Sequence, residues 1–158
     1  MTGRHGTAEW YGDLEHGSGA ITVGDDVFAD DYSCASRFGD GGGTSPEQLL
    51  AAAHCGCFTM ALAAILSAAG HTVNSLITKA RVRLEHVEGQ PTLSRIYLTT
   101  VGDVHGINQH QFQAYAKRAR EECPLSWALL GIPEIELTAT LRRTRSRPSR
   151  QRACAEHR

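Results

Sequence analysis

The sequence has 158 residues and a formal net charge of −1, with 41% hydrophobic and 21% charged residues. This length is enough for one domain with a hydrophobic core and too short for two domains of ordinary size. The shares of hydrophobic and charged residues are ordinary for a soluble globular protein. Residues 1–17 contain no apolar stretch, so we expect no secretory signal. The five cysteines are therefore interpreted as thiols in the reducing cytoplasm rather than as a disulfide framework.

Charge is distributed unevenly along the chain. Residues 142–158 hold seven arginines and one glutamate, so residues 1–141 are strongly acidic. A segment with this much like charge and no apolar periodicity predicts a disordered tail after one folded domain over 1–141. Such a tail can bind nucleic acid nonspecifically, but a solvated appendage is the simpler interpretation, and we expect no nucleic-acid partner.

The first third of the chain predicts strands and a turn. Residues 6–14 and 19–31 are β-prone and interrupted by Gly-Asp pairs, as in an antiparallel hairpin or meander. The glycine-rich stretch 36–44 lacks the spacing of a phosphate-binding loop. Its glycines are therefore expected to let the backbone turn sharply into the next helix.

Residues 45–70 predict a helix with clear ends. Ser45 can cap it, Pro46 suits its first position, Gln48 completes a Ser-x-x-Gln capping box and Gly70 is a natural stop. No residue from 49 to 70 is formally charged, so the segment is long enough to be mistaken for a membrane span. Because alanine dominates it and polar residues dilute it, we predict a central core helix, buried on all sides, and no membrane.

The second half predicts a sheet and further helices. Residues 77–89 and 92–104 alternate partly, like strands with one solvated face. A helix over 107–123 has one apolar stripe, and Pro124 ends it. Residues 124–131 predict a short helical turn and 133–143 a last strand. This order indicates an α+β fold, with helices packed on an antiparallel sheet.

Two of the cysteines can meet if the two long helices pack together. Cys55 and Cys57 project about 200° apart on their helix, so they cannot form a redox pair. Cys57 has a better partner in Cys123, the last member of the apolar stripe, and the helix start after Cys123 favours a thiolate. An inert, buried thiol is the alternative at each position. His54 is interpreted as a satisfied core histidine, and no Cys/His spacing indicates a metal site.

A charge pair can form at the start of the helix over 45–70. Glu47 lies about 15 Å along the axis from Cys57, so it cannot reach that sulfur within its own helix. It can anchor Arg37, and an Arg–Glu pair holds guanidinium donors rigidly. If the pair serves Cys57, a second subunit must supply it.

The stretches 36–62 and 116–141 together resemble the family of osmotically inducible protein C and organic hydroperoxide resistance proteins. The shared elements are Pro-Glu-x-Leu, Ala-Ala-His-x-x-Cys-Phe and Cys-Pro-x-Ser, in that order, and the likeness covers most of residues 8–141. Arg37 just before the glycine loop favours the osmotically inducible branch. The resemblance implies an α+β intertwined homodimer with active sites at the subunit interface.

The resemblance also implies a thiol peroxidase that acts in defence against oxidative and osmotic stress. Its substrates would be organic hydroperoxides, with hydrogen peroxide as a second candidate. Cys57 then matches the peroxidatic cysteine and Cys123 the resolving one, which form a disulfide, while Arg37 and Glu47 match the activating pair. A dithiol, such as a lipoyl protein, resets the disulfide, and neither cofactor nor metal is needed. An apolar pocket lined by residues such as Phe58, Met60 and Trp127 would favour organic substrates.

Two other functions remain open at this point. One is a non-catalytic member of the same fold that senses redox state or binds a small molecule. The other is a nucleic-acid-associated protein that acts through residues 142–158. Cys55 and Trp127 stand where the family commonly has a small residue and a lysine, but neither departure removes a residue of the implied mechanism.

Overall fold

The computed structural model describes residues 3–142. The predicted tail lies outside these residues apart from Arg142, and so does Cys154. The first half of the fold consists of β1 (Gly6–Tyr11), β2 (Ser18–Val23), β3 (Phe28–Ser33), α1 (Cys34–Phe38) and α2 (Pro46–Ala68). The second half consists of β4 (Val73–Val87), β5 (Gln90–Val104), α3 (Gln109–Glu122), α4 (Pro124–Ala128) and β6 (Glu134–Leu141).

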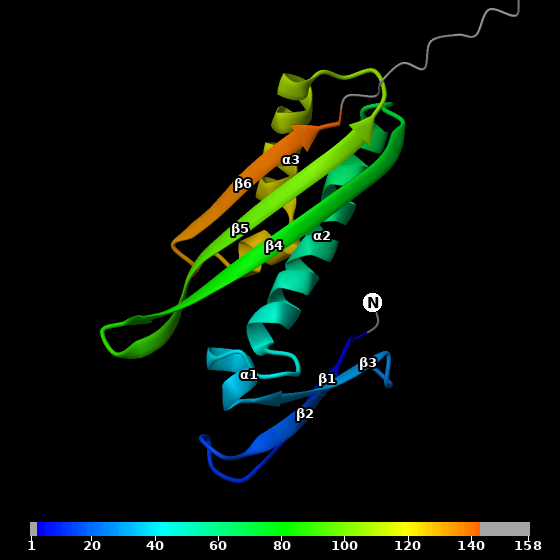
Figure 1. The fold of residues 1–158 in the computed structure, drawn as a ribbon. Coiled ribbons are helices and arrows are strands. Elements are labelled where there is room, and N and C mark those ends of the chain that lie inside the picture. Colours follow the sequence, from blue (N-terminus) through cyan, green and yellow to red (C-terminus); the bar gives the residue numbers. More distant parts are fainter. Residues whose placement is uncertain (1–2, 143–158) are drawn as a thin grey trace, which may run out of the picture.

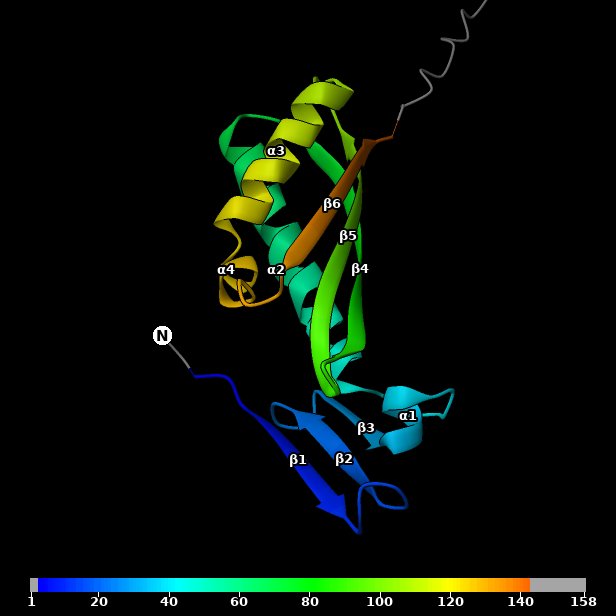
Figure 2. The ribbon, with the colours of Figure 1, turned by 90° about the vertical axis from the view of Figure 1, so that its left-hand side faces the viewer.

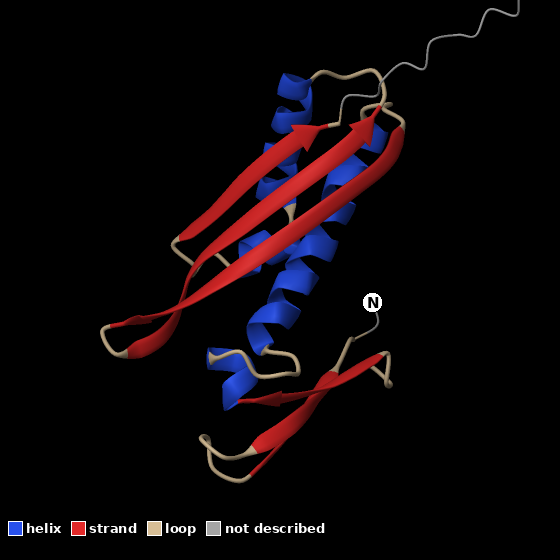
Figure 3. Ribbon diagram, viewed as in Figure 1, coloured by secondary structure: helices blue, strands red, loops and turns tan. Residues whose placement is uncertain are grey.

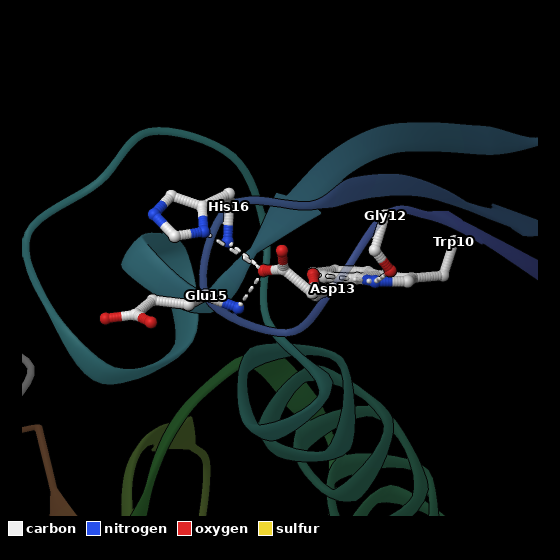
Figure 4. Close-up of polar contacts among 5 residues, drawn as sticks. All are labelled: Trp10, Gly12, Asp13, Glu15 and His16. Carbon is white, nitrogen blue, oxygen red and sulfur yellow. Dashed lines mark hydrogen bonds and ion pairs between the residues drawn. The ribbon is translucent and has the colours of Figure 1, made fainter.

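The N-terminal strands form the predicted antiparallel meander, in the order β1-β2-β3. This small sheet lies beyond the start of α2, away from the larger sheet (Figure 1). In the β1–β2 turn, the Asp13 carboxylate accepts the backbone N–H groups of Glu15 and His16, and the Trp10 indole donates to the Gly12 and Asp13 carbonyls (Figure 4). These bonds fix the turn that joins the two strands.

The larger sheet has the order β4-β5-β6, with one departure from the predicted pairing. β4 and β5 are antiparallel as expected, but β6 runs parallel to β5. The reason is that α3 and α4 carry the chain back along the sheet before β6 begins, which is the crossover that a parallel pair requires. α2, α3 and α4 all cover one face of this sheet (Figures 2 and 3). The α+β class is thus confirmed.

Helix α2 begins and ends where the sequence predicts. The Ser45 side chain accepts the Gln48 N–H, the Gln48 side chain accepts the Ser45 N–H, and Pro46 opens the helix. Gly70 follows with φ of 81°, a conformation that glycine adopts without a steric cost.

The prediction that α2 is buried on all sides is wrong for the single chain. One face is buried, through His54, Phe58, Leu62, Ile65 and Leu66, whereas Met60 is 74% exposed. By length and composition alone α2 would also qualify as a membrane span, with a mean hydropathy of 2.0. Its buried face instead forms the core with α3 and the sheet, and its other face is left uncovered within residues 3–142.

Helix α3 presents the predicted apolar stripe to α2. All four of its members are fully buried: Phe112, Ala116, Ala119 and Cys123. Gly102 of β5 makes room for this packing, because a Cβ atom there would lie 2.5 Å from the Phe112 ring. The stripe ends at Cys123, which is therefore held against α2.

Replacing the cap of α2 tests whether this helix start stabilises the fold. Ser45→Ala removes a buried acceptor of the Gln48 N–H, so we expect a loss of about 1 kcal/mol in the free energy of unfolding. Ser67→Ala, an exposed position near the other end of the same helix, is the matched control and should change it by less than about 0.5 kcal/mol. Urea unfolding followed by circular dichroism, at one protein concentration, measures both. Equal losses would contradict the prediction.

Candidate active site

The structure brings together the two cysteines that the sequence paired. The Sγ atoms of Cys57 and Cys123 lie 3.3 Å apart. Cys57 comes from the middle of α2 and is half-buried, whereas Cys123 comes from the junction of α3 and α4 and is fully buried. Both sulfurs are carried by packed helices, so their contact is set by the fold and needs no loop to move.

Cys123 lies where one helix ends and the next begins. Its backbone is extended, with φ of −68° and ψ of 120°, because Pro124 excludes a helical conformation at the preceding residue. Cys123 is thus both the last cap of α3 and the N-cap of α4. In the thiol form, its side chain accepts no capping hydrogen bond.

The surroundings shift the pKa values of the two thiols in opposite directions. Burial acts to raise the pKa of Cys123, but the backbone N–H of Ser126, the Cys57 thiol and the Ser126 hydroxyl outweigh it and lower that pKa. Burial raises the pKa of Cys57, against the backbone N–H of Leu125, and the Cys123 sulfur raises it further. Either thiol can donate in their contact, and Cys57 is the donor once Cys123 ionises. Within one chain, Cys123 is therefore the more easily ionised of the two.

A buried histidine, His54, lies near this pair and contacts Ser126. The His54 ring is fully buried, and its Nε2 lies 2.9 Å from the Ser126 Oγ, while its Nδ1 has no partner among the described residues. Burial lowers the pKa of His54, so the ring is neutral near pH 7. The expected core histidine is only half satisfied. Its one hydrogen bond is to Ser126, which lies in the first turn of α4, after Cys123.

Ser126 is the residue that the sequence left unassigned, apart from its place in the Cys-Pro-x-Ser element. It is the third residue of α4, counted from Pro124, and it is 5% exposed. The N–H at this position faces the side chain of the N-cap residue. That spacing is a signal by which a contact between Ser126 and Cys123 could have been predicted.

The predicted ion pair forms at the start of α2. The Arg37 Nε and Nη2 both donate to one Glu47 oxygen, at 3.1 and 2.8 Å. Arg37 lies at the end of α1, with its guanidinium 5.1 Å from the centre of the Phe38 ring. The other oxygen of Glu47 is buried without a partner among residues 3–142. Glu47 thus fixes Arg37 and leaves further guanidinium donors available.

The two halves of the predicted site are not brought together within one chain. Ten residues of helix separate Glu47 from Cys57, which is about 15 Å along the axis of α2. Cys123 lies at the end of α3, whereas Arg37 belongs to α1, which lies beside the N-terminal sheet (Figure 1). Within residues 3–142, the fold therefore does not bring Arg37 of the same chain to the thiol pair.

The other cysteines lie apart from the pair. Cys55 is half-buried and faces β4, where the Ala80 N–H opposes the effect of burial, which raises its pKa. This agrees with the opposite projection expected for Cys55 and Cys57. Cys34 opens α1 beside Arg37, at a concavity of about 280 Å³. Among residues 3–142, neither Cys55 nor Cys34 has a recorded contact with the Cys57 sulfur.

The predicted apolar pocket does not form from the residues named for it. Phe58 is fully buried in the core, whereas Met60 and Trp127 are 74% and 64% exposed. A concavity of about 480 Å³ does lie beside Trp127, between α4 and the start of β6. Within residues 3–142, no three His, Cys, Asp or Glu side chains group as metal ligands.

Comparisons with known proteins identify the family and the fold of the chain. The family model described as OsmC-like protein matches residues 39–138. Over 127 residues the chain is 35% identical to a protein named Peroxiredoxin OsmC from Escherichia coli K12, covering 80% of this chain and 89% of the relative. The organic hydroperoxide resistance protein OhrB of Bacillus subtilis has a similar structure, with a TM-score of 0.63 and 25% identity over 87% of this chain and 98% of that one.

An organic hydroperoxide resistance protein from Elizabethkingia anophelis shares the fold, with a TM-score of 0.67 and 22% identity over 91% of this chain and 98% of that one. The match to the family model covers more than half of the chain, and the relative from Escherichia coli exceeds 30% identity. The resemblance read from the sequence is confirmed, and the chain belongs to the OsmC-like protein family.

Proposed function

We propose that this protein is a thiol-dependent peroxidase that reduces organic hydroperoxides to alcohols, as part of the defence against oxidative stress. The observation that carries the proposal is the 3.3 Å contact between the Cys57 and Cys123 sulfurs. A relative named as a peroxiredoxin and a structural neighbour named for hydroperoxide resistance support the same chemistry. Neither a metal nor an organic cofactor takes part in it.

In the first step, the Cys57 thiolate attacks the terminal oxygen of the hydroperoxide. The O–O bond breaks, Cys57 becomes a sulfenic acid and the alkoxide takes up a proton to leave as an alcohol. We assign this step to Cys57 because it is half-buried and can meet a substrate, whereas Cys123 is fully buried.

In the second step, the Cys123 thiolate attacks the sulfenic sulfur of Cys57. A disulfide forms, and the hydroxyl leaves as water after taking up a proton. A disulfide bond is about 2.05 Å long, so the sulfurs need to approach by only about 1.3 Å from their present contact. Rapid closure protects the sulfenic acid from further oxidation.

The first step needs a positive charge near Cys57, and within residues 3–142 the predicted source, Arg37, is held by Glu47 at the start of α2. Burial holds the pKa of the Cys57 thiol above its ordinary value, and a guanidinium would favour the thiolate and orient the peroxide. We assign this role to Arg37 of a second subunit, fixed by Glu47 of that subunit. The separation of about 15 Å along α2 supports a pair from the second subunit over the pair of the same chain.

The exposed surface of the chain supports a homodimer of this kind. The uncovered face of α2 includes Met60, at 74% exposure, and the N-terminal region exposes Tyr11 and Val27, at 68% and 82%. Apolar area of this kind is favourably removed from water. A second copy that lays its N-terminal sheet along α2 would cover both surfaces and bring its Arg37 to Cys57.

A dithiol reductant, such as a lipoyl protein, is proposed to complete the cycle by thiol–disulfide exchange. This requirement places the protein in a reducing compartment, which we propose is the cytoplasm. No nucleic acid and no membrane takes part in the cycle.

A pulse of cumene hydroperoxide tests the cycle directly. One equivalent should lower the intact mass by two hydrogens, and peptide mapping should locate a Cys57–Cys123 disulfide. Dihydrolipoamide should reduce this disulfide and restore the mass. Cys57→Ser should abolish peroxide consumption, whereas Cys123→Ser should stop at the sulfenic acid on Cys57 and go on to the sulfinic acid with a second equivalent of peroxide. Cys55→Ser is the matched control and should keep the disulfide. Thiols that stay free after the pulse would contradict the proposal and favour a redox sensor or a small-molecule-binding protein of the same fold.

The source of the guanidinium is tested by complementation between two inactive variants. Arg37→Ala should slow peroxide reduction by roughly 10²-fold or more, and Cys57→Ser should stop it. In a co-expressed heterodimer of the two variants, one site combines an intact Cys57 with an intact Arg37 of the other subunit. We expect activity to return in the purified heterodimer. An inactive heterodimer would place Arg37 and Cys57 of the same chain in one site and contradict the assignment.

A further inference from the structure

A buried hydrogen bond joins His54 to Ser126, a residue in the helix turn that Cys123 begins. The His54 ring and Ser126 are 0% and 5% exposed, and their side chains lie 2.9 Å apart. Ser126 belongs to the first turn of α4, for which Cys123 is the N-cap. Residues 72 positions apart in the sequence are thus joined behind the thiol pair. The reaction steps described above do not account for this contact.

The missing partner of His54 Nδ1 indicates how the protons are arranged. A buried N–H without an acceptor is rarer and costlier than a buried acceptor without a donor. Since Nδ1 has no partner among the described residues, the proton belongs on Nε2. The His54 Nε2–H then donates to the Ser126 Oγ, and this leaves the Ser126 hydroxyl hydrogen free to donate elsewhere.

We propose that His54 and Ser126 form a relay that stabilises Cys123 as a thiolate, so that a reductant attacks the Cys57 sulfur of the disulfide and Cys123 is the leaving group. This inference rests on the disulfide of the proposed function. Ser126 is the third residue of α4, where the N–H and side chain face the N-cap residue Cys123, so both groups can donate to its thiolate. The lowered pKa of Cys123 agrees with this role.

The exchange then proceeds in a defined direction. A thiolate of the dithiol reductant bonds to the Cys57 sulfur while the Cys57–Cys123 bond breaks and its electron pair leaves with Cys123. The second thiol of the reductant then displaces Cys57 and is itself oxidised to the disulfide. Thiols of lower pKa leave faster, and attack also depends on access. Cys57 is half-buried and Cys123 fully buried, so access and leaving-group stability favour the same direction.

Few other charged groups face Cys123. From α2, Cys57 touches it and His54 acts through Ser126. Glu121 and Glu122, which precede it on α3, are exposed to solvent. Arg120 bonds the Ile135 carbonyl of β6, and Glu134 of that strand pairs with Arg95 of β5. In the proposed dimer, Arg37 and Glu47 of the second subunit would lie nearest to Cys57.

The direction of exchange can be measured without peroxide. The disulfide is formed with diamide and then treated with one equivalent of 2-mercaptoethanol, and peptide mapping locates the mixed disulfide. We expect it on Cys57 in the unaltered protein. Ser126→Ala should slow this reduction by roughly tenfold, and Ser126→Thr, which restores a hydroxyl, should recover the rate. Thr100→Val removes a buried hydroxyl that bonds Thr78 of β4, and it is the matched control.

A titration gives a second readout that a purely structural role would not change. The difference in ultraviolet thiolate absorbance between Cys57→Ser and the Cys57→Ser/Cys123→Ser double variant reports Cys123 alone. Adding Ser126→Ala or His54→Leu should move its midpoint to higher pH, because removing a donor disfavours the charged form. His54→Gln keeps a donor toward Ser126 and should restore part of the shift.

The outcomes separate this inference from the proposed function. A mixed disulfide on Cys123, no disulfide with diamide, or an unmoved midpoint in Ser126→Ala would each overturn the relay. If instead the relay variants behave as expected while cumene hydroperoxide leaves the thiols free, the relay stands and the peroxidase function fails.

Discussion

The packing of α3 on α2 is the constraint on which the rest of the site depends. Small residues at Ala116 and Ala119 let the two helices approach closely, and Phe112 fills the space that Gly102 leaves open in the sheet. Cys123 is the last member of the same buried stripe, so the packing that builds the core also sets the contact between the sulfurs. Because interiors are close-packed, the thiol pair is held in place without a dedicated loop.

The length of α2 explains why one chain does not hold a complete site. A helix of 23 residues is a rigid spacer, and it carries Glu47 at its start and Cys57 at its middle. The apolar sequence of the same helix leaves one face uncovered in the single chain. In the proposed dimer, a second copy packed against α2 would cover this face and also supply the guanidinium. Assembly and activation of the thiol are therefore linked in the proposed dimer.

Much of this arrangement follows from local sequence signals. The capping box at Ser45, the apolar stripe of α3 and the break at Pro124 depend on neighbours within a few residues, so the sequence was enough to predict them. The parallel pairing of β6 and the bond between His54 and Ser126 depend on how distant elements pack, which no local pattern records. Phe58 was misassigned to a pocket for the same reason, since periodicity does not tell which face of an all-apolar helix meets the sheet.

The two thiols differ in where their stabilisation comes from. Cys123 draws on groups of its own chain, namely Ser126 with His54 behind it, and its pKa is lowered already in the isolated fold. Burial raises the pKa of Cys57, and in the proposed site only a guanidinium of another subunit reverses that. An unassembled chain would thus keep its peroxidatic cysteine as a poorly reactive thiol. Under the proposed function, reactivity toward peroxide would appear only in the dimer, where the Cys123 sulfur, 3.3 Å from that of Cys57, would trap the oxidised sulfur.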